Sequence, residues 1–294
     1  MKLMEWSSLA EMAACAQEQG ISLGRLVFLG EVRDTEGQES SIYERMSKSW
    51  QVMKEAVEEG LSNPRKSRGG MIGGDGHKLT TYLKKGSTLS GDVLEAVSRS
   101  LAVAELNAAM GKIVAAPTAG SCGIIPGVLT MLQEKLKLSD EAIIYALFAA
   151  SGIGLIIAQR ASLSGAQGGC QAECGSAAAM AAGAAVELAG GTPFQVLDAV
   201  AISMKNNLGL VCDPVAGLVE VPCAKRNALG AANALVAADM ALAGIGSVIP
   251  ADEVIGAMGE IGRAMPEALR ETAQGGLART PTGVKLAKKF LRLE

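Results

Sequence analysis

Residues 142–158 read AIIYALFAASGIGLIIA and carry no charge, and they decide the expected fold. Seventeen residues are close to the lower limit for a helix that crosses a membrane. A helix that is apolar on every side is also typical of the centre of a large globular protein. Asp140, Glu141 and Arg160 flank the stretch closely, and no second clear span accompanies it. We therefore expect a buried central helix and no association with a membrane.

Helix signals surround this stretch on both sides. A serine or threonine followed three residues later by Glu or Gln marks a helix start, and this pattern occurs at Ser8, Ser41 and Thr192. Pro193 adds a proline at the first helical position after Thr192. The predicted helices cover residues 8–19, 41–61, 92–113, 177–188, 192–207, 226–242 and 252–263, in addition to the central helix.

Strand signals are scarce. Residues 211–221 could hold a short strand, but Pro214 and Gly217 interrupt it. The fold class is therefore mainly α: a multi-helix globular domain around the central helix, with long Gly-rich loops forming the functional site. We expect a single domain over residues 1–294, in which residues 1–85 could form a looser N-terminal lobe.

The composition restricts the class of protein. The 27 basic and 30 acidic residues give a net charge of −3, which argues against a general nucleic-acid binder. The basic stretch at residues 65–85 is expected to be a solvated face or a partner contact. No basic region followed by an apolar segment marks a signal peptide at the start. The six cysteines are therefore expected to be reduced thiols in the cytoplasm.

Three cysteines lie in loops marked by glycine, proline and aspartate. They are Cys170 in GAQGGCQAE, Cys212 in GLVCDPVAG and Cys223 in VEVPCAKRN. Thiolates are the protein ligands of iron–sulfur clusters, and a four-iron cluster has four corners to fill. Three thiolates would leave one iron open, and an open position distinguishes a catalytic metal from a structural one. If the three cysteines converge, the chain is a Lewis-acid enzyme.

The other cysteines have packing explanations. Cys174 lies four residues after Cys170, on the same face of a helix, but this is not a zinc-knuckle spacing. A small buried thiol is the simpler interpretation of Cys174. Cys15 is expected in the core, and Cys122 either lines the site without binding metal or packs in the core.

Small polar groups gather in two further loops. Residues 117–121 (PTAGS) offer hydroxyls and amides that suit a carboxylate, and residues 162–169 (SLSGAQGG) lead into Cys170. Both loops could equally be tight turns between buried helices. The single histidine, His77, is expected in a polar, basic loop at the surface. Residues 69–76 (GGMIGGDG) lack the Lys-Ser/Thr pair of a phosphate-binding loop.

These motifs together give the chain a family resemblance. It resembles the α chain of the iron–sulfur-dependent L-serine dehydratases, also called L-serine ammonia-lyases. The cysteine spacing C-x41-C-x10-C is far more specific than any single glycine pattern. The matching text is NAAMGKIVAAPTAGSCGIIPG (107–127), SGAQGGCQAE (164–173), GLVCDPVAGLVEVPCAKRNALGA (209–231) and ALRETAQGGLA (268–278).

The resemblance implies a cofactor, a reaction and a partner. Cys170, Cys212 and Cys223 would hold a 4Fe–4S cluster whose open iron activates the hydroxyl of L-serine. Dehydration would then give pyruvate and ammonia, a step in amino-acid catabolism. The family has a regulatory β region that this sequence lacks, which implies a separate β subunit and an oligomer. The catalytic base stays unknown and is expected largely from the β subunit.

Several residues are candidates for contacts with the substrate. Thr118 and Ser121 offer hydroxyls, and Lys78 and Lys225 could supply positive charge. Asn227 lies beside a matching motif, as do Asn107 and Asp213. Other functions remain open: a zinc- or cluster-binding structural protein, a dehydratase of another small hydroxy-amino acid such as threonine, a pyridoxal-phosphate dehydratase, and a membrane or scaffold protein built around residues 142–158.

Overall fold

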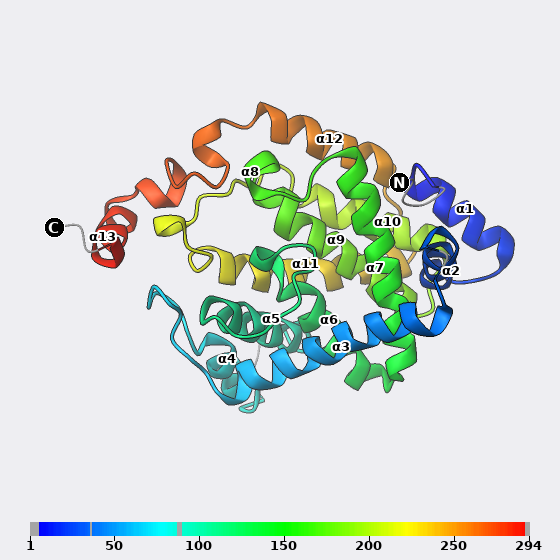
Figure 1. Ribbon diagram of the computed structural model, residues 1–294, viewed down its shortest axis with the longest axis horizontal. Coiled ribbons are helices and arrows are strands. Elements are labelled where there is room, and N and C mark those ends of the chain that lie inside the picture. Colours follow the sequence, from blue (N-terminus) through cyan, green and yellow to red (C-terminus); the bar gives the residue numbers. More distant parts are fainter. Residues whose placement is uncertain (1–5, 36, 87–89, 292–294) are drawn as a thin grey trace.

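The computed structural model describes residues 6–35, 37–86 and 90–291, and these residues form helices and loops without a β-strand (Figure 1). The mainly α fold is therefore confirmed. The α-helices of this part are α1 (Leu9–Gln19), α2 (Leu23–Thr35), α3 (Glu39–Ser62), α4 (Asp75–Leu83), α5 (Val93–Ala108), α6 (Ile124–Leu136), α7 (Asp140–Arg160), α8 (Gly165–Gly168), α9 (Ser176–Leu188), α10 (Pro193–Lys205), α11 (Cys223–Leu242), α12 (Ala251–Ala264) and α13 (Pro281–Leu291).

The apolar stretch forms α7, a buried helix of 21 residues. Within the described residues it is the single helix long and apolar enough to cross a membrane, and two thirds of its most apolar window is buried in the fold. The Ser139 hydroxyl caps its start by accepting a hydrogen bond from the amide of Ala142. The prediction of a buried central helix is confirmed.

Helix α9 shares the centre of the molecule with α7 (Figure 1). It packs against α6, α7, α10 and α11, and residues 176–186 are all buried. Seven of these eleven residues are alanine, so neighbouring helices can approach closely. A Cβ on Gly183 would lie 2.5 Å from Ile153 Cδ1, which explains a glycine at this position. The core is therefore built on small side chains.

The capping signals at Ser8 and Thr192 are confirmed. The Ser8 hydroxyl accepts a hydrogen bond from the amide of Glu11 at 3.1 Å. At α10, the Thr192 hydroxyl accepts from the Gln195 amide, and the Gln195 side chain accepts from the Thr192 amide at 2.9 Å. These caps satisfy backbone donors that the helix leaves unpaired, and so they fix where each helix begins.

Two predictions from local sequence are wrong, those for Ser41 and His77. Ser41 does not cap a helix, because α3 already begins at Glu39 and the Ser41 amide donates to the carbonyl of Gln38. Residues 211–221 form no strand, as expected from Pro214 and Gly217, and their pairing is limited to one isolated parallel bridge between Cys212 and Arg270. His77 lies in helix α4 and not in a loop, although it is exposed as expected.

Helix α2 was missing from the sequence prediction because glycines interrupt its pattern. A Cβ on Gly24 would lie 2.0 Å from the Tyr145 carbonyl oxygen, so this glycine lets α2 lie directly against α7. The other early helices also pack on later ones: α1 on α10, and α3 and α4 on α5. The division of the chain into domains stays a prediction.

Candidate functional site

Three cysteines from distant segments lie together inside the fold. Cys170 precedes a π-helical turn at Gln171–Gly175, Cys212 follows α10, and Cys223 is the first residue of α11. All three are free, and they are 2%, 3% and 9% exposed. Burial raises the pKa of Cys223 to about 12 and that of Cys212 further, and negative charge on Cys170 adds to both. The three sulfurs therefore share one buried neighbourhood.

Cys170 is the thiol of this group that ionises most readily. A hydrogen bond with the Cys174 side chain is the main cause that lowers the pKa of Cys170, against the opposing effect of burial. The positive charge of Arg226 lowers it further. Cys174 is itself buried and has a raised pKa. Its position supports the expectation of a small packed thiol that adjoins the site.

Glu173 connects the cysteines with the loop that precedes α6. Its carboxylate accepts a hydrogen bond from Thr118 Oγ1 at 2.8 Å and a longer one from Cys212 Sγ at 3.8 Å. Burial raises the pKa of Glu173. A Cβ on Gly165 would lie 2.6 Å from a carboxylate oxygen, and one on Gly120 would lie 3.1 Å away. These glycines make room for the carboxylate.

Asn227 holds the same loop in place from α11. Its side chain is fully buried and donates to the carbonyls of Gly120 at 2.7 Å and Cys223 at 2.9 Å. Its Oδ1 accepts from the Gly123 amide at 2.9 Å. One amide side chain therefore fixes the position of the 120–123 loop relative to Cys223.

The Cys212 segment is held by a buried ion pair and by backbone bonds. Arg226 donates to Asp213 Oδ1 at 2.8 Å and to the Val211 carbonyl at 2.7 Å. The other Asp213 oxygen accepts from the Leu277 amide at 2.7 Å. The Cys212 amide and carbonyl bond to residues 269 and 271 on the opposite side. Residues 211–213 are thus fixed on both sides before any ligand binds.

The structure brings some of the predicted site residues together and separates others. Thr118, Ser121 and Asn227 lie around Glu173 and the cysteines, and the Thr118 and Ser121 hydroxyls are 3.1 Å apart. Lys78 and Lys225 instead pair with Asp75, and their side chains are 74% and 59% exposed. Among the described residues, both lysines therefore pair with an acidic side chain other than those beside the cysteines.

Cys122 and His77 also lie apart from this cluster. Cys122 packs in an apolar group with Val57, Val103 and Leu106, which favours the packing interpretation over a lining role. His77 bonds through Nδ1 to the Leu61 carbonyl at 2.9 Å.

Known proteins are similar to this chain over most of its length. Residues 5–278 match the family described as the serine dehydratase alpha chain. The chain belongs to the serine dehydratase alpha chain family. It is 54% identical over 284 residues to the probable L-serine dehydratase alpha chain of Bacillus subtilis, covering 96% of this chain and 94% of the relative.

Two further relatives differ in length. The L-serine dehydratase alpha chain of Peptoniphilus asaccharolyticus is 44% identical, with 96% of this chain and 97% of the relative covered. L-serine dehydratase 1 of Escherichia coli is 39% identical over 280 residues, which cover 93% of this chain but 61% of the relative. This family member therefore spans the alpha chains almost completely and about three fifths of the longer protein.

The cysteines of this family member suit a cluster better than a single metal ion. No group of three or more His, Cys, Asp or Glu side chains in the described ranges could hold one ion. The cysteines of a four-iron cluster bind different iron atoms and do not converge on one point. Three free, buried thiols in one neighbourhood therefore fit a four-iron cluster. The Arg226 guanidinium would offset part of the negative charge of the cluster and its thiolates.

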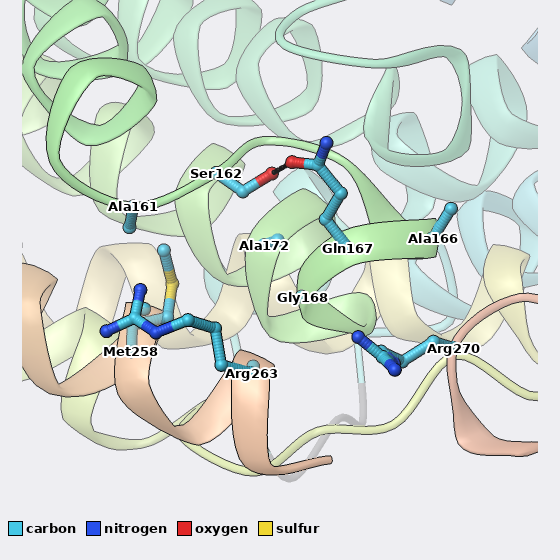
Figure 2. Close-up of a pocket in the computed structure, with 11 residues that line it drawn as sticks. Ala161, Ser162, Ala166, Gln167, Gly168, Ala172, Met258, Arg263 and Arg270 are labelled. Carbon is cyan, nitrogen blue, oxygen red and sulfur yellow. Dashed lines mark hydrogen bonds between the residues drawn. The ribbon is translucent and has the colours of Figure 1, made fainter. Parts of the chain in front are cut away.

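A pocket lies on the other side of the segment that carries Cys170. It has a volume of about 360 Å³ and is bounded by the 161–172 segment, by α12 and by Arg270 (Figure 2). Gly168 and Ala172, which flank Cys170 in sequence, line it. None of the cysteines does, so this pocket is separate from the cysteine cluster.

Proposed function

We propose that the chain is the α subunit of an L-serine dehydratase that converts L-serine to pyruvate and ammonia. The observation that carries the proposal is the meeting of Cys170, Cys212 and Cys223 in one buried neighbourhood. These three residues would hold a 4Fe–4S cluster. The match to the serine dehydratase alpha chain family over residues 5–278 supports the reaction.

The geometry favours a cluster over the structural-zinc alternative. A structural zinc site needs four ligands around one ion, with Zn–S distances of about 2.3 Å. Among the described side chains, no group of three His, Cys, Asp or Glu could hold a single ion. Thiolate ligands spread over several iron atoms do not have this requirement.

When bound, the cluster would supply a Lewis-acidic iron with an open position for the serine hydroxyl. The residues of this chain would bind the rest of the substrate and exclude water. Thr118 and Ser121 present hydroxyls beside Glu173, and the nearby loop amides suit a carboxylate. Asn227 would act as a positioning residue, because it holds the 120–123 loop against α11.

The proton on the serine Cα must also be removed, and the base is expected mainly from a second chain. The carboxylate of Glu173 is the acidic group of this chain that contacts both Thr118 and Cys212. It would orient Thr118 towards the substrate and could accept a proton. Lys78 and Lys225 stay predictions as substrate contacts, since both pair with Asp75 near the surface.

The lengths of the relatives support a separate β subunit. The chain covers 94% of the Bacillus subtilis protein that is named an alpha chain, but 61% of the Escherichia coli L-serine dehydratase 1. We propose that a β chain does for this α chain what the remaining part of the longer protein does there. The assembly would be a heteromer in the cytoplasm, with reduced thiols available to the cluster.

A direct assay tests the proposed reaction. The chain is reconstituted without oxygen, with iron and sulfide, and pyruvate formation from L-serine is measured with and without a candidate β chain. We expect activity that needs the cluster and is highest with the second chain. L-threonine in the same assay tests the alternative substrate. Absence of pyruvate from the loaded two-chain complex would contradict the proposal.

A further inference from the structure

The pocket behind the Cys170 segment has an unusual balance of charge. Its lining contains two charged side chains, Arg263 and Arg270, and no Asp or Glu. Neither arginine forms an ion pair or a side-chain hydrogen bond with any residue in the described ranges. Figure 2 shows them on opposite sides of the pocket, with Gly168 and Ala172 between. The lining therefore carries two positive charges and no negative charge.

Arg270 gives the clearest indication of a missing partner. Its Nε atom is buried and has no hydrogen-bond partner among the described residues. Buried polar groups in proteins are nearly always hydrogen-bonded, because losing water without a replacement costs free energy. The Arg270 backbone is held in place by its bridge to Cys212. A half-buried guanidinium on a fixed backbone, with an unpaired buried N–H, can donate a hydrogen bond to an anion.

The fold partly explains the positive charge of Arg263, but it does not explain that of Arg270. Arg263 lies in the last turn of α12, where a positive charge interacts favourably with the helix dipole. Arg270 follows a short 3-10 turn at Glu267–Leu269 and lies outside the α-helices. Its charge therefore points to a ligand more directly than that of Arg263.

The lining also indicates which anion suits the pocket. The planar guanidinium of Arg matches a carboxylate, to which it can donate two parallel hydrogen bonds. The apolar side chains of Ala161, Ala166, Ala172 and Met258 form much of the remaining wall. Such walls suit a small organic anion better than a strongly hydrated phosphate. An ammonium group on the ligand would find two guanidiniums and no carboxylate, which disfavours an amino acid.

We propose that this pocket binds a small carboxylate that carries no ammonium group. This is the class to which pyruvate, the product of the reaction proposed above, belongs. That the ligand would be the product of this enzyme rests on the proposed function. That the pocket binds a small carboxylate does not rest on it. Because Gly168 and Ala172 flank Cys170 and Arg270 pairs with Cys212, an occupant would contact both segments that carry these cysteines.

Calorimetric titration of the full chain without a cluster tests the proposal. The probes are pyruvate, L-serine and inorganic phosphate, each added to the wild type and to the Arg270→Gln and Arg263→Gln variants. We expect pyruvate to bind and to be preferred over L-serine and phosphate by about tenfold or more. Arg270→Gln should weaken pyruvate binding by about tenfold, and Arg263→Gln should weaken it less.

Arg279→Gln is the matched control, because it removes the same charge from an exposed position outside the pocket. It should leave pyruvate binding unchanged. Far-UV circular dichroism checks that each variant is folded, and the exposed Arg263 provides a variant that does not disturb the core.

Three results would overturn the proposal: no binding of pyruvate, equal or tighter binding of L-serine or phosphate, or pyruvate binding that neither pocket variant weakens. The titration is independent of catalysis. Pyruvate binding that depends on Arg270 would stand even if the loaded complex formed no pyruvate from L-serine. Conversely, if the loaded complex is active but the chain without a cluster does not bind pyruvate, this inference is wrong and the proposed function stands.

Discussion

Asn227 shows how much of the site depends on one buried side chain. It makes three hydrogen bonds that join Gly120, Gly123 and Cys223. Asn227→Ala would leave buried backbone groups unpaired, which should cost about 2–4 kcal/mol of unfolding free energy. Urea denaturation measures this loss. Asn206→Ala is the control, since Asn206 bonds to Asn233 at the surface and should change stability by about 0.5 kcal/mol or less. Equal shifts would contradict the assigned role.

Glu173 is expected to matter for catalysis more than for folding. Glu173→Gln keeps an oxygen that can accept from Thr118 but removes the negative charge beside Cys212. We expect the rate of pyruvate formation to fall about a hundredfold, which is typical of losing a positioned acid or base group, with the iron content unchanged. Glu267→Gln, at an exposed position, is the control. A Glu173→Gln enzyme with full activity would remove this residue from the machinery.

For single residues, the sequence predicted the three cysteines as ligands but did not point to Glu173. The cysteines were recognisable because their spacing belongs to a long motif. The importance of Glu173 arises from contact with Thr118, which is 55 residues away in sequence and reaches it through the fold alone. The role of Lys78 and Lys225 as substrate contacts stays a prediction. They lie near matching motifs, but pairing with Asp75 takes both side chains towards the surface.

Helix α10 offers a test of the capping signals. Its start is fixed by the reciprocal bonds of Thr192 and Gln195, so Thr192→Ala should lower stability by about 1 kcal/mol. Ser41→Ala is the matched control. Ser41 has the same sequence pattern, but it lies exposed inside the first turn of α3 and caps nothing, so its loss should be close to neutral. Thermal unfolding of both variants measures the two losses of stability. Similar losses would show that the cap at Thr192 contributes little.

The carboxylate of Glu187 accepts hydrogen bonds at the start of helix α2. Its environment predicts that the stability of the fold depends on pH. Glu187 accepts hydrogen bonds from the Gly24 amide and the Ser22 hydroxyl, and burial raises the pKa of Glu187 from 4.5 to about 7. The folded chain therefore holds a proton that the unfolded chain releases at lower pH. By linkage, stability is fully present below about pH 4.5 and falls as pH rises to about 7, by up to about 3 kcal/mol.

Glu187→Gln removes this titration while keeping an oxygen for the Gly24 amide. Denaturant unfolding from pH 5 to pH 8 should therefore show a shallower decline for the variant than for the wild type. Parallel curves would indicate that Glu187 ionises alike in both states, contrary to the burial seen here.

At the element scale, helices with clear caps or unbroken apolar runs were predictable, and those shaped by packing were not. The start of α10 followed from Thr192-Pro193, which acts within a few residues. Helix α2 was not predicted because Gly24 weakens its helical pattern. The same glycine allows α2 to lie against the Tyr145 carbonyl on α7. Local propensity cannot anticipate a glycine that is required by a neighbour distant in sequence.

The whole molecule places its reactive residues on elements packed around a small-residue core. Helix α7 was expected at the centre from its sequence, whereas the equal role of α9 depends on how four helices meet around its alanines. Cys170 leads into α9 through the π-turn, and Cys223 begins α11, which packs on α9. The core therefore fixes the relative position of two of the three cysteines.

The central claim is that Cys170, Cys212 and Cys223 hold an iron–sulfur cluster. The most direct test is the iron and sulfide content of the anaerobically reconstituted chain, together with its absorbance near ~400 nm, where cysteine-bound clusters absorb. We predict about four iron and four sulfide per chain for the wild type and for Cys122→Ser, whose thiol packs in a separate apolar group. Cys212→Ser should lose most of both. A wild type that binds no sulfide, or a Cys212→Ser variant with full cluster content, would contradict the account.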